Sequence, residues 1–335
     1  MGGNALKGTF TRRYDKAEYF ALTEEVVAIA SRNPNINYLS VIPAYRGKDS
    51  FGDMDILYTT KGDEQCLEAA YFRNTFAPNQ IAKNSEVISF DYKDLQIDFI
   101  HIKGDQFDYA LNYYSWNDCG NLVGKLAHQL GLKHGHKGLV LPLRDGNNKF
   151  ADVLLSLNHS DTLRFLGLDE RKFETGFESL DEIFNFIAES PYYNPENYKL
   201  ENLNSIAKIR DRKRDTYNKF LAFGESWAGK RYVGPADRTV HLQNIFRFFE
   251  ECYPAYKQAI RDLAVQQLVK EKFNGTIVQC WTGLSGKELG EFMKELRTDW
   301  FFEFENILYL DINNIQSRVM KKVDTFNKTR SMHRE

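Results

Sequence analysis

The architecture of this chain is best predicted from Arg46-Gly-Lys-Asp-Ser-Phe-Gly-Asp-Met-Asp-Ile-Leu57, a turn-rich connector that leads into a strand expected over residues 53–58. Residues two apart on a strand project from the same face, so Asp53 and Asp55 should present two carboxylates side by side. Like charges at that separation repel one another unless a cation lies between them. Paired divalent ions are the usual solution in sites that transfer phosphoryl groups.

A third carboxylate lies further along, in Leu95-Gln-Ile-Asp-Phe-Ile-His-Ile102, which also has the composition of a strand. Leu95, Ile97 and Phe99 share one face of this strand, and Asp98 points to the other. A charge within so apolar a strand needs a partner. If the two strands are neighbours, the three carboxylates form an oxygen-rich site suited to Mg²⁺.

The Asp-x-Asp pair by itself has a simpler interpretation, because many such pairs lie on a solvated strand edge or in a turn. Its surroundings favour phosphate chemistry instead. Gly52, directly before the pair, permits a close approach of the backbone to a phosphate. Arg46, upstream, is a candidate bidentate donor to a phosphate group.

The first half of the chain predicts helices and strands in a mixed order. A helix is expected over residues 15–31, where Asp15 and Glu18 can form a capping box. Its apolar face is expected to carry Phe20, Val26, Val27 and Ala30. The other elements are expected at residues 38–42 (strand), 62–75 (helix), 87–91 (strand) and 95–102 (strand), the last two joined as a hairpin. Such a mixture indicates an α+β layer and not a regular βαβ series.

After about residue 150 the pattern becomes helical, so we place a domain boundary near Phe150, just after the turn Asp145-Gly-Asn-Asn148. Helices are expected at residues 180–187, 203–223, 241–273 and 285–296, the last with Ser285 as its N-cap. His134-Gly-His136, in a glycine-rich turn, is expected to face solvent and is assigned no site.

Composition sets limits on partners and location. The 335 residues carry 44 Lys and Arg against 46 Asp and Glu, a formal charge of -2, so any nucleic-acid surface must be local. Cys66, Cys119, Cys252 and Cys280 lack the spacing of a zinc site and are expected to be reduced, buried thiols. No apolar stretch has the length of a signal-peptide core or a membrane span, so we expect a cytoplasmic protein with no membrane contact.

The segment 46–57 closely resembles the catalytic signature of family X DNA polymerases, of which polymerase β is the familiar member. The resemblance continues, in order, through residues 96–102 and then through residues 113–132, and in all it covers roughly residues 15–143. It implies a nucleotidyltransferase palm at residues 1–106 and a thumb-like nucleotide-selection segment at 107–150. The helical pattern beyond it predicts a mostly helical C-terminal domain at 151–335, a candidate for nucleic-acid binding.

The resemblance also implies roles for individual residues. Asp53 and Asp55 would ligate two Mg²⁺ ions, or Mn²⁺ in their place, and Asp98 would join at the catalytic ion and accept the proton of the primer hydroxyl. The residues expected to contact the nucleotide are Arg46, Ser50, Gly52, Tyr113, Tyr114, Trp116, Asp118 and Asn121. Lys125 stands where the family has a template-contacting arginine. Without the resemblance, Tyr113 and Tyr114 would be interpreted as ordinary aromatic core.

The chain departs from the family pattern at several positions. Ile42-Pro43 replaces the family's Gly-Ser, which removes a hydroxyl donor to the triphosphate, and Trp116 replaces a glycine beside the sugar pocket. Gln96 replaces an arginine that pairs with the third aspartate. The family's N-terminal lyase and helix-hairpin-helix regions have no counterpart before the first expected helix, so contact with a template must come from elsewhere or be absent.

A basic run, Lys208-Ile-Arg-Asp-Arg-Lys-Arg-Asp215, is the candidate nucleic-acid surface of the second half. Arg210, Arg212, Lys213 and Arg214 would follow a phosphate backbone, although a solvated, salt-bridged helix explains the same run. Residues 274–290 weakly resemble the Gly-Lys-x-Leu-Gly segment of tRNA nucleotidyltransferases and poly(A) polymerases, and they also fit a simple corner between two helices.

The sequence therefore predicts a metal-dependent nucleotidyltransferase that adds nucleoside monophosphates from (d)NTP to a 3′ hydroxyl of DNA and releases pyrophosphate. Two alternatives stay open. One is an enzyme of the same superfamily that extends the 3′ end of RNA or tRNA. The other is a protein that keeps the fold and binds nucleic acid without the chemistry, against which the three carboxylates argue.

Overall fold

The computed structural model describes residues 5–62, 67–234 and 238–332. The chain forms two compact units, the first made of Met1–Pro142 with Asp152–Cys252 and the second of Leu143–Ala151 with Tyr253–Glu335. Phe150, near which we expected a boundary, lies within strand β10 (Asn148–Ser156). The second unit therefore takes the tip of the hairpin between β9 (Gly138–Asp145) and β10 together with the C-terminal helices.

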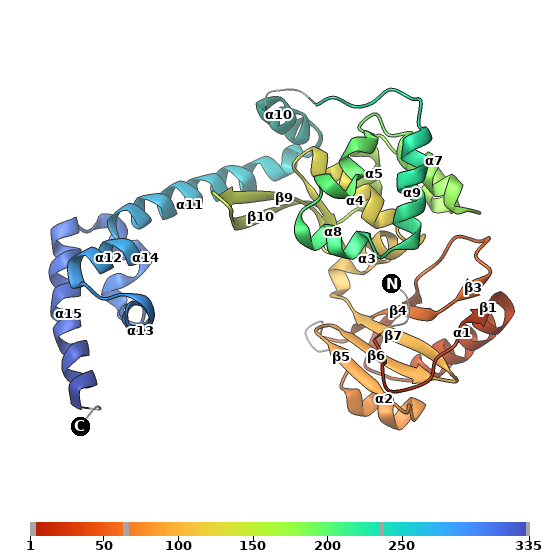
Figure 1. Ribbon diagram of the computed structural model, residues 1–335, viewed down its shortest axis with the longest axis horizontal. Coiled ribbons are helices and arrows are strands. Elements are labelled where there is room, and N and C mark those ends of the chain that lie inside the picture. The colour runs from red at the N-terminus through yellow and green to blue at the C-terminus, as the bar shows by residue number, and fades with distance from the viewer. Residues whose placement is uncertain (1–4, 63–66, 235–237, 333–335) are drawn as a thin grey trace. The chain divides into compact units, whose positions relative to one another are not determined.

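A five-stranded mixed sheet forms one part of the first unit, and a group of helices forms another (Figure 1). Its strands, in spatial order, are β2 (Ile36–Val41), β4 (Asp53–Thr60), β7 (Leu95–His101), β6 (Val87–Tyr92) and β5 (Ile81–Asn84). β4 and β7 run parallel, and the other neighbouring pairs of this sheet are antiparallel. α1 (Lys16–Ala30) and α2 (Ala69–Phe76) pack against one face of it, in a core that includes Met54, Phe90 and Phe99.

The first helix starts as the sequence predicts, but it presents a different face to the core. Asp15 accepts a hydrogen bond from the Glu18 amide, and the Glu18 carboxylate accepts one from the Asp15 amide, which confirms the capping box. Phe20, expected on the apolar face, is instead 50% exposed, and Tyr19 takes the buried position. The prediction for Phe20 was wrong because Leu22, Val26 and Tyr19 define the stripe that meets the sheet.

The hairpin and the second helix also follow the expected order. The β6–β7 turn passes through Lys93 and Asp94, both with positive φ, as the twist of a two-residue hairpin loop requires. α2 is shorter than the helix expected over residues 62–75, and residues 63–66 of that prediction lie outside the described part of the chain.

Helices and a small sheet complete the first unit. α3 (Phe107–Tyr114) and α4 (Cys119–Gln129) follow β7 and lead to β8 (Lys133–Gly135), which pairs with β9. The later helices are α5 (His159–Phe165), α6 (Glu170–Thr175), α7 (Leu180–Ala188), α8 (Ser205–Asp211), α9 (Asp215–Ser226) and α10 (Arg238–Phe248), with 3₁₀ turns at Gly104–Gln106, Pro195–Tyr198, Leu200–Asn202 and Glu250–Cys252. The short strands β1 (Tyr14–Asp15) and β3 (Ser50–Phe51) pair with each other.

Two predicted helices are interrupted. The helix expected over residues 203–223 is two helices, α8 and α9, because the buried Asp211 at the end of α8 is held in ion pairs with Lys125 and Arg210, and Arg214 is extended before α9. The helix expected over residues 241–273 is α10 and α11 (Tyr253–Lys272). Pro254 lies in the first turn of α11, where the missing N–H of a proline costs no helical hydrogen bond.

The second unit has a helical core of its own. α11, α12 (Gly275–Thr282), α13 (Gly286–Leu296), α14 (Phe304–Tyr309) and α15 (Ile312–Met332), with a 3₁₀ turn at Trp300–Phe302, supply its elements. The core includes Val278, Phe292, Leu296, Ile307, Ile315 and Val319. α12 and α13 meet at a turn over residues 283–285, the corner that the sequence predicts, with Ser285 at the N-cap.

The described residues bear on the expectations for membrane contact and for the cysteines. No helix among the described residues is long and apolar enough to cross a membrane. Cys119, Cys252 and Cys280 are free thiols, but only Cys119 is fully buried. Cys280 is exposed, contrary to expectation, because α12 turns Val278 and not Cys280 into the core. Cys66 lies outside the described residues.

Candidate metal and nucleotide site

The three aspartates come together because β4 and β7 are neighbours. In the parallel register Asp55 lies opposite Asp98, and Asp53 lies opposite Gln96. One carboxylate oxygen from each of Asp53, Asp55 and Asp98 lies within 4.8 Å of the other two. The strand adjacency that the sequence left open is therefore present, and the three side chains share the face of the sheet opposite Met54 and Phe99.

The electrostatics of this cluster are those of crowded like charges. Burial, and then the charges of Asp53 and Asp98, raise the pKa of Asp55 to about 7. Burial also raises the pKa of Asp98, which is 9% exposed, while hydrogen bonds from Ser89 and Gln96 oppose the shift. The Gln96 amide donates to both Asp98 oxygens at 3.0 Å.

The donor set fits a magnesium site. All three candidate ligands are carboxylates, which are hard oxygen donors of the kind that Mg²⁺ and Mn²⁺ prefer. A cation among them would remove the repulsion that raises the pKa values of Asp55 and Asp98. Asp53 and Asp55 are the residues that would hold such ions, with Asp98 as the third ligand.

Arg46, the predicted phosphate donor, is held by the helical part of the first unit. Its Nε donates to the Glu178 carboxylate, and its Nη1 donates to the Thr175 carbonyl at 2.7 Å. Ser50 and Gly52 lie next to the aspartates, on β3 and just before β4. The Ser50 hydroxyl accepts a hydrogen bond from another arginine, Arg13, at 3.0 Å.

Two cations near the aspartates were not predicted. Arg13 also donates to the Ser50 carbonyl at 2.8 Å, and a Cβ on Gly52 would lie 2.9 Å from its Nη1, so Gly52 makes room for the guanidinium. Burial lowers the pKa of Lys48, while the charges of Asp53 and Asp55 act to raise it. Lys48 was visible inside the signature segment, whereas Arg13 belongs to no periodic pattern.

Tyr113 and Tyr114 lie at the end of α3, and Tyr114 feels the charge of Asp55. Burial raises the pKa of Tyr114, and the charge of Asp55 contributes to the same shift. Tyr114 stacks on His136 with ring centres 5.8 Å apart. A Cβ on Gly120 would lie 1.9 Å from the Tyr113 carbonyl oxygen, so the start of α4 packs directly on this backbone and requires glycine.

Trp116 lies between α3 and α4 with a positive φ, and so does Asn117. The Trp116 amide donates to the Pro43 carbonyl at 2.8 Å, and its indole packs against Phe173 and Phe177. A Cβ on Gly176 would lie 2.4 Å from the indole Cη2. The ring that we expected at the sugar pocket therefore packs on the connection between α6 and α7.

The predicted nucleotide residues of α4 contact the predicted nucleic-acid residues of α8 and α9. Asp118 forms an ion pair with Arg214, and the Asn121 amide oxygen accepts from Arg210 Nη2 at 2.8 Å. Lys125 pairs with Asp211 at 2.9 Å. Arg210 and Arg214 are thus directed toward α4, while Arg212 and Lys213 are exposed.

The histidine prediction was wrong for His134. Its side chain is buried, and its Nδ1 lies 2.7 Å from the Tyr109 hydroxyl, which also lies 2.9 Å from the Thr162 hydroxyl. Burial lowers the pKa of His134 well below its usual range. The glycine-rich turn looked solvated from the sequence, but β8 brings His134 under α3 and α5, which no local pattern reveals.

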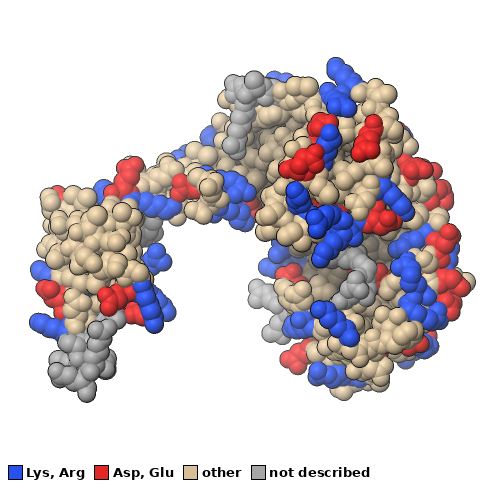
Figure 2. Space-filling view, in the orientation of Figure 1, with Lys and Arg blue, Asp and Glu red and all other residues tan. Residues whose placement is uncertain are grey.

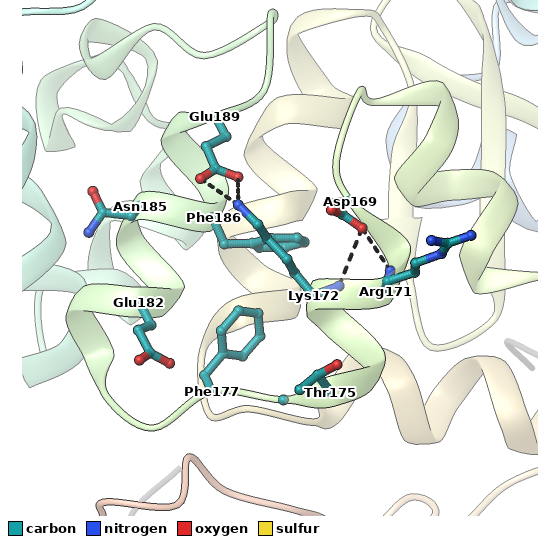
Figure 3. Close-up of a pocket in the computed structure, with 10 residues that line it drawn as sticks. Asp169, Arg171, Lys172, Thr175, Phe177, Glu182, Asn185, Phe186 and Glu189 are labelled. Carbon is teal, nitrogen blue, oxygen red and sulfur yellow. Dashed lines mark hydrogen bonds and ion pairs between the residues drawn. The ribbon is translucent and has the colours of Figure 1, made fainter.

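A cavity of about 440 Å³ lies between α6 and α7 (Figure 3). Phe177 and Phe186 lie at its base, and Lys172 reaches across to the Glu189 carboxylate at 2.7 and 2.8 Å. The described residues that line it include none of the predicted site residues. It does include Thr175, whose carbonyl accepts from Arg46.

No protein-family model matches this sequence, and no curated protein is significantly similar to it. The chemistry of the chain must therefore be inferred from its own site. That site consists of three carboxylates on two adjacent parallel strands, two cations beside them, and the tyrosine-bearing end of α3.

Proposed function

We propose that this protein is a metal-dependent nucleotidyltransferase of the polymerase β type, which adds nucleoside monophosphates from (d)NTP to a 3′ hydroxyl of DNA and releases pyrophosphate. The observation that carries the proposal is the cluster of Asp53, Asp55 and Asp98, with carboxylate oxygens within 4.8 Å of one another on β4 and β7. Repulsion among crowded, partly buried carboxylates destabilises the fold unless a bound cation neutralises their charge. Such clusters are therefore typical of functional sites.

The residues around the cluster suit this reaction. Two Mg²⁺ ions held by Asp53 and Asp55 would neutralise charge on the triphosphate and on the attacking oxygen. Asp98, whose pKa burial raises, is a suitable acceptor for the proton of the 3′ hydroxyl. Lys48, which feels the charges of Asp53 and Asp55, and Arg46 would bind phosphate oxygens, in the way that cationic side chains clamp a transferring group.

An acceptor strand would follow the basic residues of α8. Figure 2 shows Lys and Arg gathered over this helix, and Lys208, Arg212 and Lys213 are exposed there. Because Arg210 and Arg214 join α8 and the start of α9 to α4, these exposed cations stand next to the segment proposed to contact the nucleotide. Local cations of this kind bind a phosphate backbone even when the whole chain has a formal charge of -2.

Asp98→Asn tests the proposal directly. The variant should lose nucleotide incorporation by at least about 100-fold, because it loses both a metal ligand and a proton acceptor, while nucleotide binding persists. Asp108→Asn, which removes an exposed carboxylate on α3, is the matched control and should remain active. Incorporation would be measured on primed DNA, single-stranded DNA and tRNA, with dNTP and with NTP.

The same assay separates the alternatives. Extension of tRNA with NTP, and not of DNA, would assign the chain to RNA 3′ ends. Full activity of Asp98→Asn would overturn the proposed mechanism. If the unaltered protein binds nucleic acid but extends no acceptor with either Mg²⁺ or Mn²⁺, it is a nucleic-acid-binding protein without the chemistry.

A further inference from the structure

The turn that carries Arg46 is fastened to the connection between α6 and α7. The Arg46 amide donates to the Phe177 carbonyl and the Gly47 amide donates to the Glu178 carbonyl, both at 2.8 Å. A Cβ on Gly47 would lie 2.5 Å from the Glu178 carbonyl oxygen, so this approach requires glycine. The backbone of the turn is therefore fixed by residues from another part of the first unit.

The Arg46 side chain is fixed by the same connection. Nε donates to the Glu178 carboxylate and Nη1 to the Thr175 carbonyl, and neither contact uses Nη2. A Cβ on Gly176 would lie 3.0 Å from Nη1, so the guanidinium packs closely on this glycine. A guanidinium has five N–H groups in a planar fork, so two anchored positions still leave N–H groups for a phosphate.

We propose that Glu178 is a positioning residue for nucleotide binding, which holds the Arg46 guanidinium in the orientation that receives the triphosphate. The proposal rests on the proposed function, because it assigns Arg46 a phosphate. Glu178 itself is given no contact with the nucleotide and acts through Arg46.

The physical gain is preorganisation. A long arginine side chain loses rotamer freedom when it binds a ligand, and an arginine that is already held loses less. The pair contributes little to folding, because the side chains of Arg46 and Glu178 are 44% and 59% exposed and water screens their attraction. A change at Glu178 should therefore affect nucleotide binding more than stability.

Glu178→Ala should raise the KM for the nucleotide by about three- to tenfold and leave kcat within about twofold, since a charge-assisted hydrogen bond at a partly exposed position is lost. The KM of Glu178→Gln should lie between those of Glu178→Ala and the unaltered protein, because the amide oxygen of glutamine still accepts a hydrogen bond from Arg46 Nε. Glu189→Gln is the matched control, because it breaks the Lys172 pair across the neighbouring cavity and leaves Arg46 untouched (Figure 3).

A second measurement separates positioning from a general structural effect. In an Arg46→Ala background, Glu178→Ala should change the KM no further, because its partner is already gone. An unchanged or lower KM in Glu178→Ala, or an equal loss in both backgrounds, would overturn the inference. Absence of incorporation by the unaltered protein would instead overturn the proposed function, so the two failures are distinguishable.

Discussion

Asp55 lies beside Asp53 and Asp98, and burial together with these charges raises its pKa to about 7. The pKa of an aspartate in an unfolded chain is about 4, so the folded protein binds this proton more tightly than the unfolded chain does. The resulting stabilisation is complete below about pH 4 and is lost as the pH rises through 7. In metal-free buffer, Asp55→Asn should raise the free energy of unfolding by about 2 kcal/mol near pH 8 and change it little near pH 4. Urea denaturation at the two pH values measures this difference.

Asp108→Asn serves as the control here too, because its exposed carboxylate has no part in the cluster. Mg²⁺ should stabilise the unaltered protein more than the Asp55→Asn variant, since the variant offers one ligand fewer. A variant less stable than the parent near pH 8 without metal would contradict the repulsion that we describe.

Single residues differ in how far the sequence predicts them. Asp53, Asp55 and Asp98 were predictable, because a period of two places each side chain on a known face of its strand. Arg13 was not, because it reaches Ser50 from outside any periodic element. The packing of the Trp116 ring on Gly176 and Phe177 was not predictable, because these residues are distant in sequence.

Among the elements, the junction between α8 and α9 depends most clearly on a buried charge. The Asp211 side chain is fully buried and pairs with Lys125, which is 12% exposed. Asp211→Ala should lower the free energy of unfolding by about 3 kcal/mol, because it leaves a half-buried ammonium without its partner. Chemical denaturation would measure the loss.

Two further variants sharpen this test. Lys125→Met combined with Asp211→Ala should recover part of the stability, since the charge that remains without this carboxylate, Arg210, is 46% exposed and hydrated. Asp215→Ala, at the exposed pair with Lys219 on α9, should cost less than about 1 kcal/mol. Equal costs at Asp211 and Asp215 would show that burial does not matter at this junction.

Elements with local signals were predicted well. α1 has a capping box, and β6 and β7 are joined by a two-residue turn, so each carries its own boundary in the sequence. The break after Asp211 has no such signal, because the charge run 208–215 suits a continuous solvated helix equally well. The buried position of Asp211 depends on a partner distant in sequence, Lys125 on α4.

At the scale of the whole molecule, the formal charge of -2 means that affinity for nucleic acid must come from a local surface. Replacing Lys208, Arg212 and Lys213 together with alanine should weaken acceptor binding and reduce its salt dependence by about two units of slope, because each cation releases counterions from a phosphate. The KM for the nucleotide should change little. Binding titrations over a range of salt concentrations measure the slope.

The matched control removes three other exposed lysines of the first unit, Lys61, Lys83 and Lys137. This variant has the same change in net charge, so it should keep the original slope if the α8 surface is responsible. An equal loss of slope in the two variants would assign binding to the general charge of the protein.

The shape of the turn over residues 43–47 depends on residues that are distant from it in sequence. Three backbone hydrogen bonds hold residues 43–47 from outside the sheet, those from Trp116 to Pro43, from Arg46 to Phe177 and from Gly47 to Glu178. An isolated sheet could keep the three clustered carboxylates and yet lose the shape of the turn that bears Arg46. The carboxylate cluster and the shape of the Arg46 turn therefore depend on different stretches of the polypeptide. If the proposed function is correct, such a truncation would keep metal affinity and lose nucleotide affinity.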